Sequence, residues 1–290
     1  MPISMPANDT PVPLLPAVLV FAGTDPTSGA GLQADILTLA SLGCHPLSVV
    51  TAVTVQDTVG VDDFLPMEAD WIADQARGVL EDIHVAAIKI GMLDSTEAVA
   101  AIAEVVADYP DIPLILDPVL ASGRGDALSS EDMVAALRDL LLPQTTVVTP
   151  NSLEARRLAE LAEDEDEEEE DEEAEEKTLE LQECARRILD LGSEYVLITG
   201  AHEQGAQVSN TLYNTRGVVQ RLRWDRLPGS YHGSGCTLAS ALAAFLAQGV
   251  DVAEAAKEAQ EYTYQALKAA FRPGMGQYIP DRLFWARDDD

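Results

Sequence analysis

Short apolar runs alternate with longer amphipathic segments along most of the chain. Runs of apolar and β-branched residues predict strands at 17–22, 47–55, 86–90, 114–116, 146–148 and 195–198. Apolar residues at helical spacing predict helices at 31–42, 68–82, 96–107, 130–142, 152–161, 178–191, 236–247 and 252–270. Segments 210–213 and 218–223 predict a hairpin, and Ser130 is the expected N-cap of the helix at 130–142.

Strands that alternate with helices predict an α/β fold with a mostly parallel central sheet and helices on both faces. The uniform alternation predicts a single domain over residues 17–290, after a flexible, proline-rich N-terminal lead-in at residues 1–16. Ligands of such folds bind beyond the carboxyl ends of the strands. The residues that directly follow each strand are therefore the candidates for chemistry.

The charge of the chain narrows the choice of partners. The 290 residues contain 18 Lys and Arg against 50 Asp and Glu, which gives a net charge of −32. Nucleic acid and anionic membranes would repel such a chain, so neither is an expected partner. Residues 163–176 form a nearly continuous acidic run. Because like charges disfavour packing, the run is expected to be a solvated insert between two helices.

The cysteines and the hydropathy bear on the cellular compartment of the protein. Cys44, Cys184 and Cys236 are far apart and have no zinc-site or disulfide spacing, which favours a reducing compartment. No Lys or Arg precedes Arg77, and no apolar run is long enough to span a bilayer. A cytoplasmic location is expected.

A glycine-rich loop, GTDPTSGAG at residues 23–31, follows the first strand. Gly29, Gly31 and Ala34 fit part of a dinucleotide-binding fingerprint, but the loop is longer than that fingerprint allows. A nicotinamide-dependent oxidoreductase and a plain glycine-rich turn both stay open from these residues alone. A phosphate-binding P-loop is excluded, because the sequence has no Gly-Lys pair.

Acidic and amide side chains follow the later strands. Asp117 comes after the strand at 114–116, and Asn151 and Glu154 come after the strand at 146–148. A lone Asp at a strand end is often only a helix cap. Several oxygen ligands at adjacent strand ends suit Mg²⁺, which binds carboxylates together with phosphates and water.

The sequence GSGC at 233–236 opens an apolar helix. Free backbone N–H groups at a helix start form an anion hole. Cys236 in that first turn is expected to have a lowered pKa and thiolate character, although a small packing residue is an equal alternative. An anion hole, a Mg²⁺ site and a glycine loop together favour phosphoryl transfer.

Six motifs in order resemble the hydroxymethylpyrimidine/phosphomethylpyrimidine kinases of thiamine biosynthesis, which belong to the ribokinase-like superfamily. The resemblance covers about residues 17–272. The motifs are AGTDPTSGAGLQADI near the start, TAVTVQDT at 51–58, KIGML at 89–93, DPVL at 117–120, TPNSLEA at 149–155 and HGSGCTLASALAA at 232–244.

The resemblance implies a three-layer ribokinase-like fold and ATP- and Mg²⁺-dependent phosphorylation of 4-amino-5-hydroxymethyl-2-methylpyrimidine and of its monophosphate. A pyridoxal or pyridoxine kinase of the same fold is the alternative. A pyrimidine-binding protein without turnover is a third class, which retention of Cys236, Asp117 and Glu154 disfavours. Because members of the family are commonly dimers, a homodimer stays open.

The resemblance also implies roles for single residues. Cys236 matches the catalytic base, with Gly233, Ser234 and Gly235 as the anion hole. Asp117 and Glu154 match the Mg²⁺ positions. The positions that match the pyrimidine pocket are Gly23, Asp25, Ala30, Gln56, Met92 and Val119. The positions that match the nucleotide side are Asn151, Thr199 and His202. Gln56 is expected to read a ring nitrogen and the amine together, because its amide both donates and accepts.

Three segments depart from the family pattern. Residues 199–202 read Thr-Gly-Ala-His where the family often has Lys-Gly-Gly-His, so a phosphate-facing lysine is absent there. Asn210 stands where an aspartate is usual, and residues 228–232 replace the usual Asn-Thr-His. These departures bear on nucleotide affinity and on the second phosphorylation, and they leave the pyrimidine pocket intact.

Overall fold

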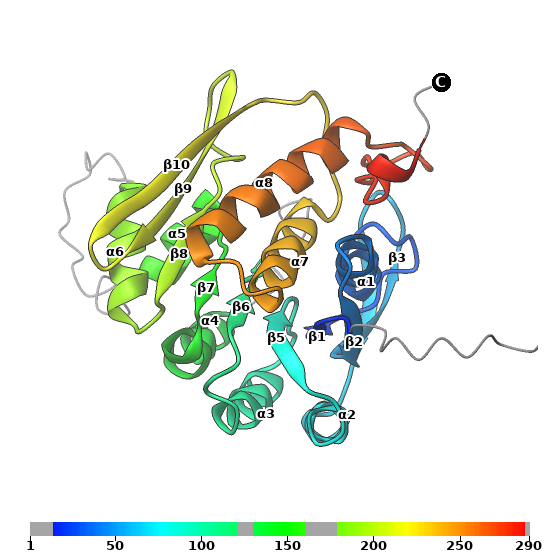
Figure 1. The fold of residues 1–290 in the computed structure, drawn as a ribbon, viewed down its shortest axis with the longest axis vertical. Helices are drawn as coiled ribbons and strands as arrows, with labels where there is room; N and C mark the ends of the chain where they lie inside the picture. Colours follow the sequence, from blue (N-terminus) through cyan, green and yellow to red (C-terminus); the bar gives the residue numbers. More distant parts are fainter. Residues whose placement is uncertain (1–13, 121–129, 161–178, 288–290) are drawn as a thin grey trace, which may run out of the picture.

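Eight strands form one central sheet in the computed structural model, which describes residues 14–120, 130–160 and 179–287 (Figure 1). Their order across the sheet is β10-β9-β8-β7-β6-β5-β1-β2. β1, β2 and β5 to β8 run parallel, whereas β9 and β10 form an antiparallel hairpin at one edge. The strands are β1 (Ala17–Ala22), β2 (His45–Val50), β5 (Val85–Ile90), β6 (Leu114–Leu116), β7 (Val147–Val148), β8 (Tyr195–Ile198), β9 (Gln207–Asn214) and β10 (Gly217–Asp225).

Helices cover both faces of this sheet, as the sequence predicted. α1, α7 and α8 lie on one face and α2 to α6 on the other (Figure 1). The helices are α1 (Gly31–Ser41), α2 (Ala69–Leu80), α3 (Thr96–Ala107), α4 (Glu131–Ala136), α5 (Ser152–Ala159), α6 (Leu181–Asp190), α7 (Ser234–Ala247) and α8 (Val252–Lys268).

The central strand β1 shows why two helical layers form. Every residue of AVLVFA is buried. Because successive side chains of a strand point to opposite faces, Leu19 and Phe21 join the core under α2 and α3, while Val18 and Val20 join the core under α1 and α7. A strand that is apolar on both faces therefore requires helices on both.

The strand expected at 47–55 is wrong as one element. It splits at Thr51 into β2 and a second strand, β3 (Ala52–Gln56), which pairs with β4 (Val61–Pro66) in a separate two-stranded ribbon. Thr51 is buried at the break, where its N–H donates to Ala22 and its carbonyl accepts from Met67. β4 is largely exposed and carries two acids and a proline, so its pattern did not indicate a strand.

Helix ends differ in detail from the expected ones. The helix expected at 130–142 has the predicted Ser130 cap, but its α-helical part ends at Ala136. It continues as a π-helical turn at Leu137–Leu141 and a 3₁₀ turn at Leu142–Gln144. α7 begins at Ser234 rather than at Cys236. The acidic run at 163–176 and most of the expected lead-in at 1–16 lie outside the described residues.

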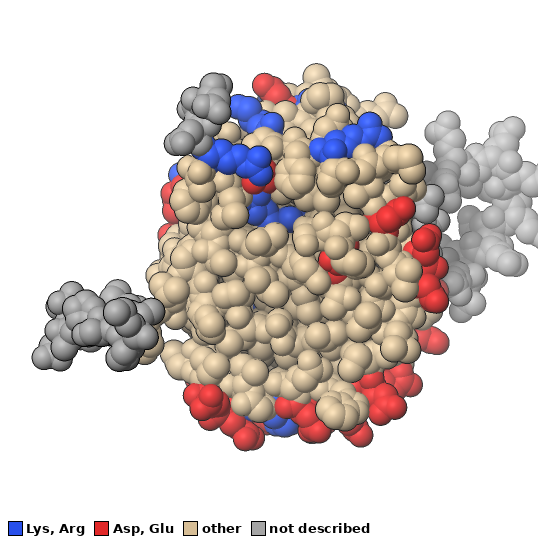
Figure 2. All heavy atoms as spheres, turned by 90° about the vertical axis from the view of Figure 1, so that its right-hand side faces the viewer, with Lys and Arg blue, Asp and Glu red and all other residues tan. Residues whose placement is uncertain are grey.

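The sequence pattern predicts no helix or strand after the helix at 252–270. Residues 271–287, here named the C-terminal segment, return toward α1 and end in a 3₁₀ turn at Phe284–Ala286. Figure 2 shows the face that carries this segment, with acidic side chains along its lower edge and basic ones near its upper end. Within the described part of the chain, no helix is long and apolar enough to cross a membrane.

Candidate active site

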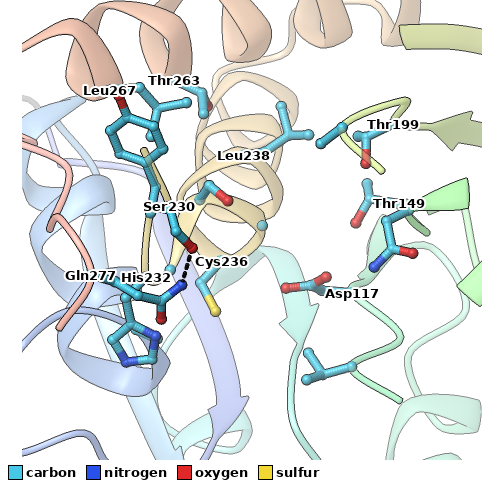
Figure 3. Close-up of a pocket in the computed structure, with 18 of the residues that line it drawn as sticks. Asp117, Thr149, Thr199, Ser230, His232, Cys236, Leu238, Thr263, Leu267 and Gln277 are labelled. Carbon is cyan, nitrogen blue, oxygen red and sulfur yellow. Dashed lines mark hydrogen bonds between the residues drawn. The ribbon is translucent and has the colours of Figure 1, made fainter. Parts of the chain in front are cut away.

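A cavity of about 490 Å³ lies where the carboxyl ends of the central strands meet the start of α7 (Figure 3). This is the position that the fold class predicts for a ligand. All but one of the residues expected in the site line it. They are Gly23, Ala30, Gln56, Met92, Asp117, Val119, Asn151, Glu154, Thr199, His202, Gly233, Ser234, Gly235 and Cys236.

Asp25 is the expected site residue that does not line the cavity. Its carboxylate is buried and accepts hydrogen bonds from the Thr27 N–H and hydroxyl, the Ala30 N–H and His232 Nε2, at 2.7–2.9 Å. Burial raises the pKa of Asp25, but these hydrogen bonds outweigh it and hold the pKa below its ordinary value. Asp25 therefore fixes the glycine loop in this structure.

The glycines of the loop are required by packing against the protein itself. A Cβ on Gly31, at φ +57°, would lie 2.3 Å from the carbonyl oxygen of Gly23. A Cβ on Gly29 would lie 2.3 Å from the His232 ring. These contacts account for both glycines without the dinucleotide fingerprint that they resemble.

The anion hole that the sequence predicts falls at the start of α7. Gly233 is the N-cap, with φ +81°, and no side chain caps the first N–H groups of the helix. A Cβ on Gly233 would lie 1.9 Å from the Gly29 carbonyl oxygen, so only glycine fits between the helix and the glycine loop. The free N–H groups and the helix dipole favour a phosphate group at this position.

The expectation of a lowered pKa for Cys236 is wrong for this structure. Burial raises the pKa of Cys236 to about 12, and the charges of Asp117 and Asp35 act in the same direction. The Lys89 ammonium and the Gly31 N–H oppose that rise only in part. Cys236 and Asp117 point toward the same space from α7 and from the end of β6 (Figure 3). The thiol is therefore protonated until the charge around it changes.

The buried carboxyl group of Asp117 and the half-buried one of Glu154 form the acidic side of the cavity. Burial raises the pKa of Asp117 to about 6, and burial together with the charge of Asp117 raises the pKa of Glu154 to about 8. Asp117 Oδ2 is buried without a hydrogen-bond partner. Glu154 also closes a capping box on α5, because its carboxylate accepts from the Asn151 N–H at 2.9 Å. A cation bound between Asp117 and Glu154 would favour the charged form of both carboxyl groups and lower their pKa values.

A buried ion pair supports the floor of the cavity. Lys89 and Asp35 are both fully buried, and Lys89 Nζ lies 3.0 Å from Asp35 Oδ2. Ser240 donates to Asp35 at 2.7 Å. Burial lowers the pKa of Lys89, but the charge of Asp35 outweighs burial and the net shift is upward. Lys89 lines the cavity and adds a fixed positive charge near Cys236 and Asp117.

Gln56, the last residue of β3, lines the end of the cavity that is expected to hold the pyrimidine. The Gln56 amide nitrogen donates to Thr54 Oγ1 at 2.7 Å and to the Thr24 carbonyl at 3.3 Å. Both donors are thus engaged within the protein, and Oε1 is left to accept from a ligand. The expectation that Gln56 donates and accepts at once does not fit this arrangement.

The loop after β8, on the expected nucleotide side of the cavity, is held by internal hydrogen bonds although its sequence departs from the family pattern. The guanidinium of Arg226 donates to the carbonyls of Ala201, Glu203 and Gly205 at 2.6–2.8 Å. Asn210 accepts from the Gly200 N–H at 3.1 Å, so it keeps the adjacent turn in place. Arg226 is a residue that the sequence reasoning missed, since nothing near it in the chain shows which carbonyls it reaches.

Comparison with known proteins identifies the family. A sequence model of the phosphomethylpyrimidine kinase family matches residues 25–281. The chain belongs to this family. It is 39% identical over 268 residues to the hydroxymethylpyrimidine/phosphomethylpyrimidine kinase of Streptomyces coelicolor, covering 92% of this chain and 94% of that protein. The Escherichia coli enzyme of the same name is 37% identical over 253 residues, covering 87% and 91%.

Solved structures of phosphomethylpyrimidine kinases and their relatives share the fold. Staphylococcus aureus pyridoxal kinase in complex with ADP matches with a TM-score of 0.80 and 29% identity, over 94% of this chain and 95% of that one. Phosphomethylpyrimidine kinase from Clostridium difficile matches with a TM-score of 0.70 and 30% identity, over 87% and 99%. These findings confirm the expected ribokinase-like fold and phosphotransferase class.

Proposed function

We propose that this protein transfers the γ-phosphoryl group of ATP to the hydroxymethyl group of 4-amino-5-hydroxymethyl-2-methylpyrimidine, as a kinase of thiamine biosynthesis. The observation that carries this proposal is one cavity that brings Cys236 and the expected anion hole together with five of the six expected pyrimidine positions. Family membership supports it, as do the names of the Streptomyces coelicolor and Escherichia coli relatives.

The pyrimidine lies at the end of the cavity lined by Gln56, Met92 and Val119. Gln56 Oε1 accepts from the exocyclic amine, and the side chains of Met92 and Val119 provide apolar walls. The hydroxymethyl group then faces Cys236 at the start of α7. When ATP and the pyrimidine are bound in the same site, the reaction needs no bimolecular encounter, and the two reactants are held in a fixed orientation.

The reaction forms a bond between the hydroxymethyl oxygen and the γ-phosphorus and breaks the bond from that phosphorus to the β–γ bridging oxygen. ADP leaves with the electron pair of the broken bond. Cys236 Sγ takes the hydroxyl proton when it is present as the thiolate. The N–H groups at 233–236 hold the charge of the transferred phosphoryl group. Transfer to the resulting monophosphate uses the same groups, and we propose this second phosphorylation as well.

Mg²⁺ fits the acidic side of the cavity. Among the described residues, no three His, Cys, Asp or Glu side chains form a cluster that could enclose a metal by themselves. Asp117 and Glu154 with water and ATP phosphates match the ligands that Mg²⁺ prefers. The unpartnered Oδ2 of Asp117 supports this assignment. When bound, Mg²⁺ would neutralise phosphate charge and the carboxylate charge that raises the pKa of Cys236.

A second candidate function is pyridoxal kinase. The Staphylococcus aureus pyridoxal kinase in complex with pyridoxal matches with a TM-score of 0.79 and 29% identity. Pyridoxal also carries a hydroxymethyl group on an aromatic ring, but it lacks the exocyclic amine. Since Gln56 Oε1 is the atom left to accept from that amine, the geometry favours the pyrimidine.

We also propose a homodimer in a reducing, cytoplasmic compartment. The β3–β4 ribbon exposes apolar side chains, with Val55 59% and Leu65 67% exposed. A second copy that packs on this ribbon would cover them. All three cysteines are free, which suits a reducing compartment. Sedimentation velocity of the wild type and of Leu65→Glu tests the dimer, since the variant should be monomeric if the ribbon is the interface.

The proposed reaction is tested by measuring ADP release with ATP, Mg²⁺ and the hydroxymethylpyrimidine, with product mass determined in parallel. We expect ADP release that depends on the pyrimidine, and masses that correspond to one and then two added phosphoryl groups. Asp117→Asn should lose most of this activity, whereas Asp108→Asn on the exposed end of α3 should retain it. ADP release without a phosphorylated pyrimidine would refute the proposal.

A further inference from the structure

Arg282 of the C-terminal segment is buried beside the site, although it does not line the cavity. Its residue is 3% exposed, and its guanidinium donates three hydrogen bonds. Nη1 donates to the Ser28 carbonyl at 3.1 Å, Nη2 to the Gly29 carbonyl at 2.5 Å, and Nε to Thr237 Oγ1 at 3.1 Å. The first two acceptors belong to the glycine loop and the third belongs to the first turn of α7.

These acceptors lie on either side of Gly233, the N-cap that the anion hole requires. The Gly29 carbonyl oxygen packs so closely on Gly233 that a Cβ there would be 1.9 Å away. Thr237 Oγ1, the acceptor of the third bond, itself donates to the Gly233 carbonyl at 2.8 Å. One guanidinium group therefore holds both partners of the contact between the glycine loop and α7.

The main chain of Arg282 is anchored to two helices. Its carbonyl accepts from the Ser41 hydroxyl at the end of α1 and from the Tyr262 hydroxyl on α8, both at 2.7 Å. The preceding N–H, of Asp281, donates to the Ala266 carbonyl at 3.0 Å. The guanidinium thus extends from a fixed base, and its planar fork can reach three acceptors at once, which a lysine ammonium cannot do in the same geometry.

The charge of Arg282 is also close to the reacting groups. Burial lowers the pKa of Arg282, and the nearby Cys236 and Asp35 act in the opposite direction. A buried guanidinium whose hydrogen bonds go to carbonyl and hydroxyl oxygens costs desolvation free energy. Because Arg282 lies between the glycine loop and α7, a functional role would explain why this cost is tolerated.

We propose that Arg282 is a positioning residue that sets the spacing between the glycine loop, which carries the pyrimidine, and the start of α7, which carries the phosphoryl group. This inference rests on the proposed kinase function. Arg282 acts through Gly29 and Thr237 and touches neither substrate. Its contribution is therefore to turnover, through the distance between the two reactants.

Arg282→Lys keeps the charge and removes the fork, and Arg287→Lys is its matched control. Arg287 lies in the same segment and is 65% exposed, with one ion pair to Asp281. We expect kcat of Arg282→Lys to fall by about 10- to 100-fold, because a displacement on the order of 1 Å costs up to about 10²-fold. KM for ATP and for the pyrimidine, and every parameter of Arg287→Lys, should stay near wild type.

A second pair of variants keeps the test valid if Arg282→Lys does not fold. Thr237→Val removes the hydroxyl that links Arg282 to Gly233. Thr38→Val is its control, because buried Thr38 makes the same bond to the carbonyl four residues earlier on α1, away from the site. We expect Thr237→Val to lose at least as much thermal stability as Thr38→Val, because it also leaves Arg282 Nε without its acceptor, and only Thr237→Val to lose kcat.

All variants are measured beside the wild type, well below their unfolding temperatures and normalised to folded protein. A wild-type enzyme without turnover on the pyrimidine would refute the proposed function. A wild type with turnover, together with Arg282→Lys or Thr237→Val at wild-type kcat, would overturn only the positioning role. A change confined to KM would also overturn it, because it would place the effect on binding.

Discussion

Gly233→Ala tests the anion hole most sharply, because the chain contains a matched control. Gly233 has φ +81° and a Cβ there would lie 1.9 Å from the Gly29 carbonyl oxygen. Gly249, just after α7, has φ +83° and no atom within 4 Å of its ideal Cβ. Both substitutions impose the same backbone strain, of about 1–2 kcal/mol for an L-residue in this region. Only Gly233→Ala adds a collision with the site.

The size of the expected effect follows from that collision. To restore an ordinary carbon–oxygen contact, the glycine loop and the start of α7 must separate by more than about 1 Å. A displacement of this size between reacting groups costs about 10²-fold in rate. The N–H groups of the anion hole move with the helix start, and loss of one such donor costs about 10²- to 10³-fold. We therefore expect kcat of Gly233→Ala to fall at least about 10²-fold.

The assay is steady-state ADP release, with thermal unfolding recorded on the same samples. Gly249→Ala should show a lowered unfolding temperature and wild-type kcat. Gly233→Ala should show a similar or larger drop in unfolding temperature together with the loss of kcat. If the two variants had equal kcat, the start of α7 would not hold the phosphoryl group, and the reasoning would fail.

Three further predictions concern single groups of the site. Cys236→Ala should lower kcat by on the order of 10² to 10⁴, as for a lost general base. Steady-state kinetics of the control variant Cys184→Ala, at a buried core position, should show an unchanged kcat. Gln56→Leu should reduce the preference for hydroxymethylpyrimidine over pyridoxal by roughly 1–3 kcal/mol, measured as the ratio of kcat/KM values, because the amine loses its acceptor. The pKa values of Asp117 and Glu154 are raised in the fold, to about 6 and about 8, so protonation of these groups stabilises the ligand-free protein. This stabilisation is complete below about pH 4, and it is lost as the pH rises through the two raised values. Mg²⁺ should therefore raise the unfolding temperature more at pH 8 than at pH 5, and an equal rise at both values would argue against metal binding at this pair.

The order of the elements that build the central sheet and its two helical layers, and the place of the cavity, could be predicted from the sequence, because both follow from local patterns. Apolar runs such as 17–22 identify buried strands, and ligands of parallel sheets lie beyond the strand ends. The break at Thr51 could not be predicted, since TAVTVQ continues the β-branched pattern and only the pairing with β4 separates the two strands.

The chemistry of single residues was less predictable, because it depends on neighbours distant in the chain. The helix start alone indicated a lowered pKa for Cys236. Asp117 and Asp35, which come from other elements, reverse that direction. Asp25 has the residue type of a ligand-binding group, yet the loop itself and His232 use its oxygens. Arg282 lies more than 250 positions from the carbonyls that it holds, so no local signal could identify it.

The central claim is that the protein phosphorylates the hydroxymethyl group of an aminopyrimidine. The most direct measurement is a competition in one vessel, with equal concentrations of hydroxymethylpyrimidine and pyridoxal, limiting ATP with Mg²⁺, and products separated and identified by mass. The account predicts that the pyrimidine monophosphate forms first and in excess, followed by the diphosphate. A mixture in which pyridoxal phosphate predominates, or in which neither ring is phosphorylated, would contradict it.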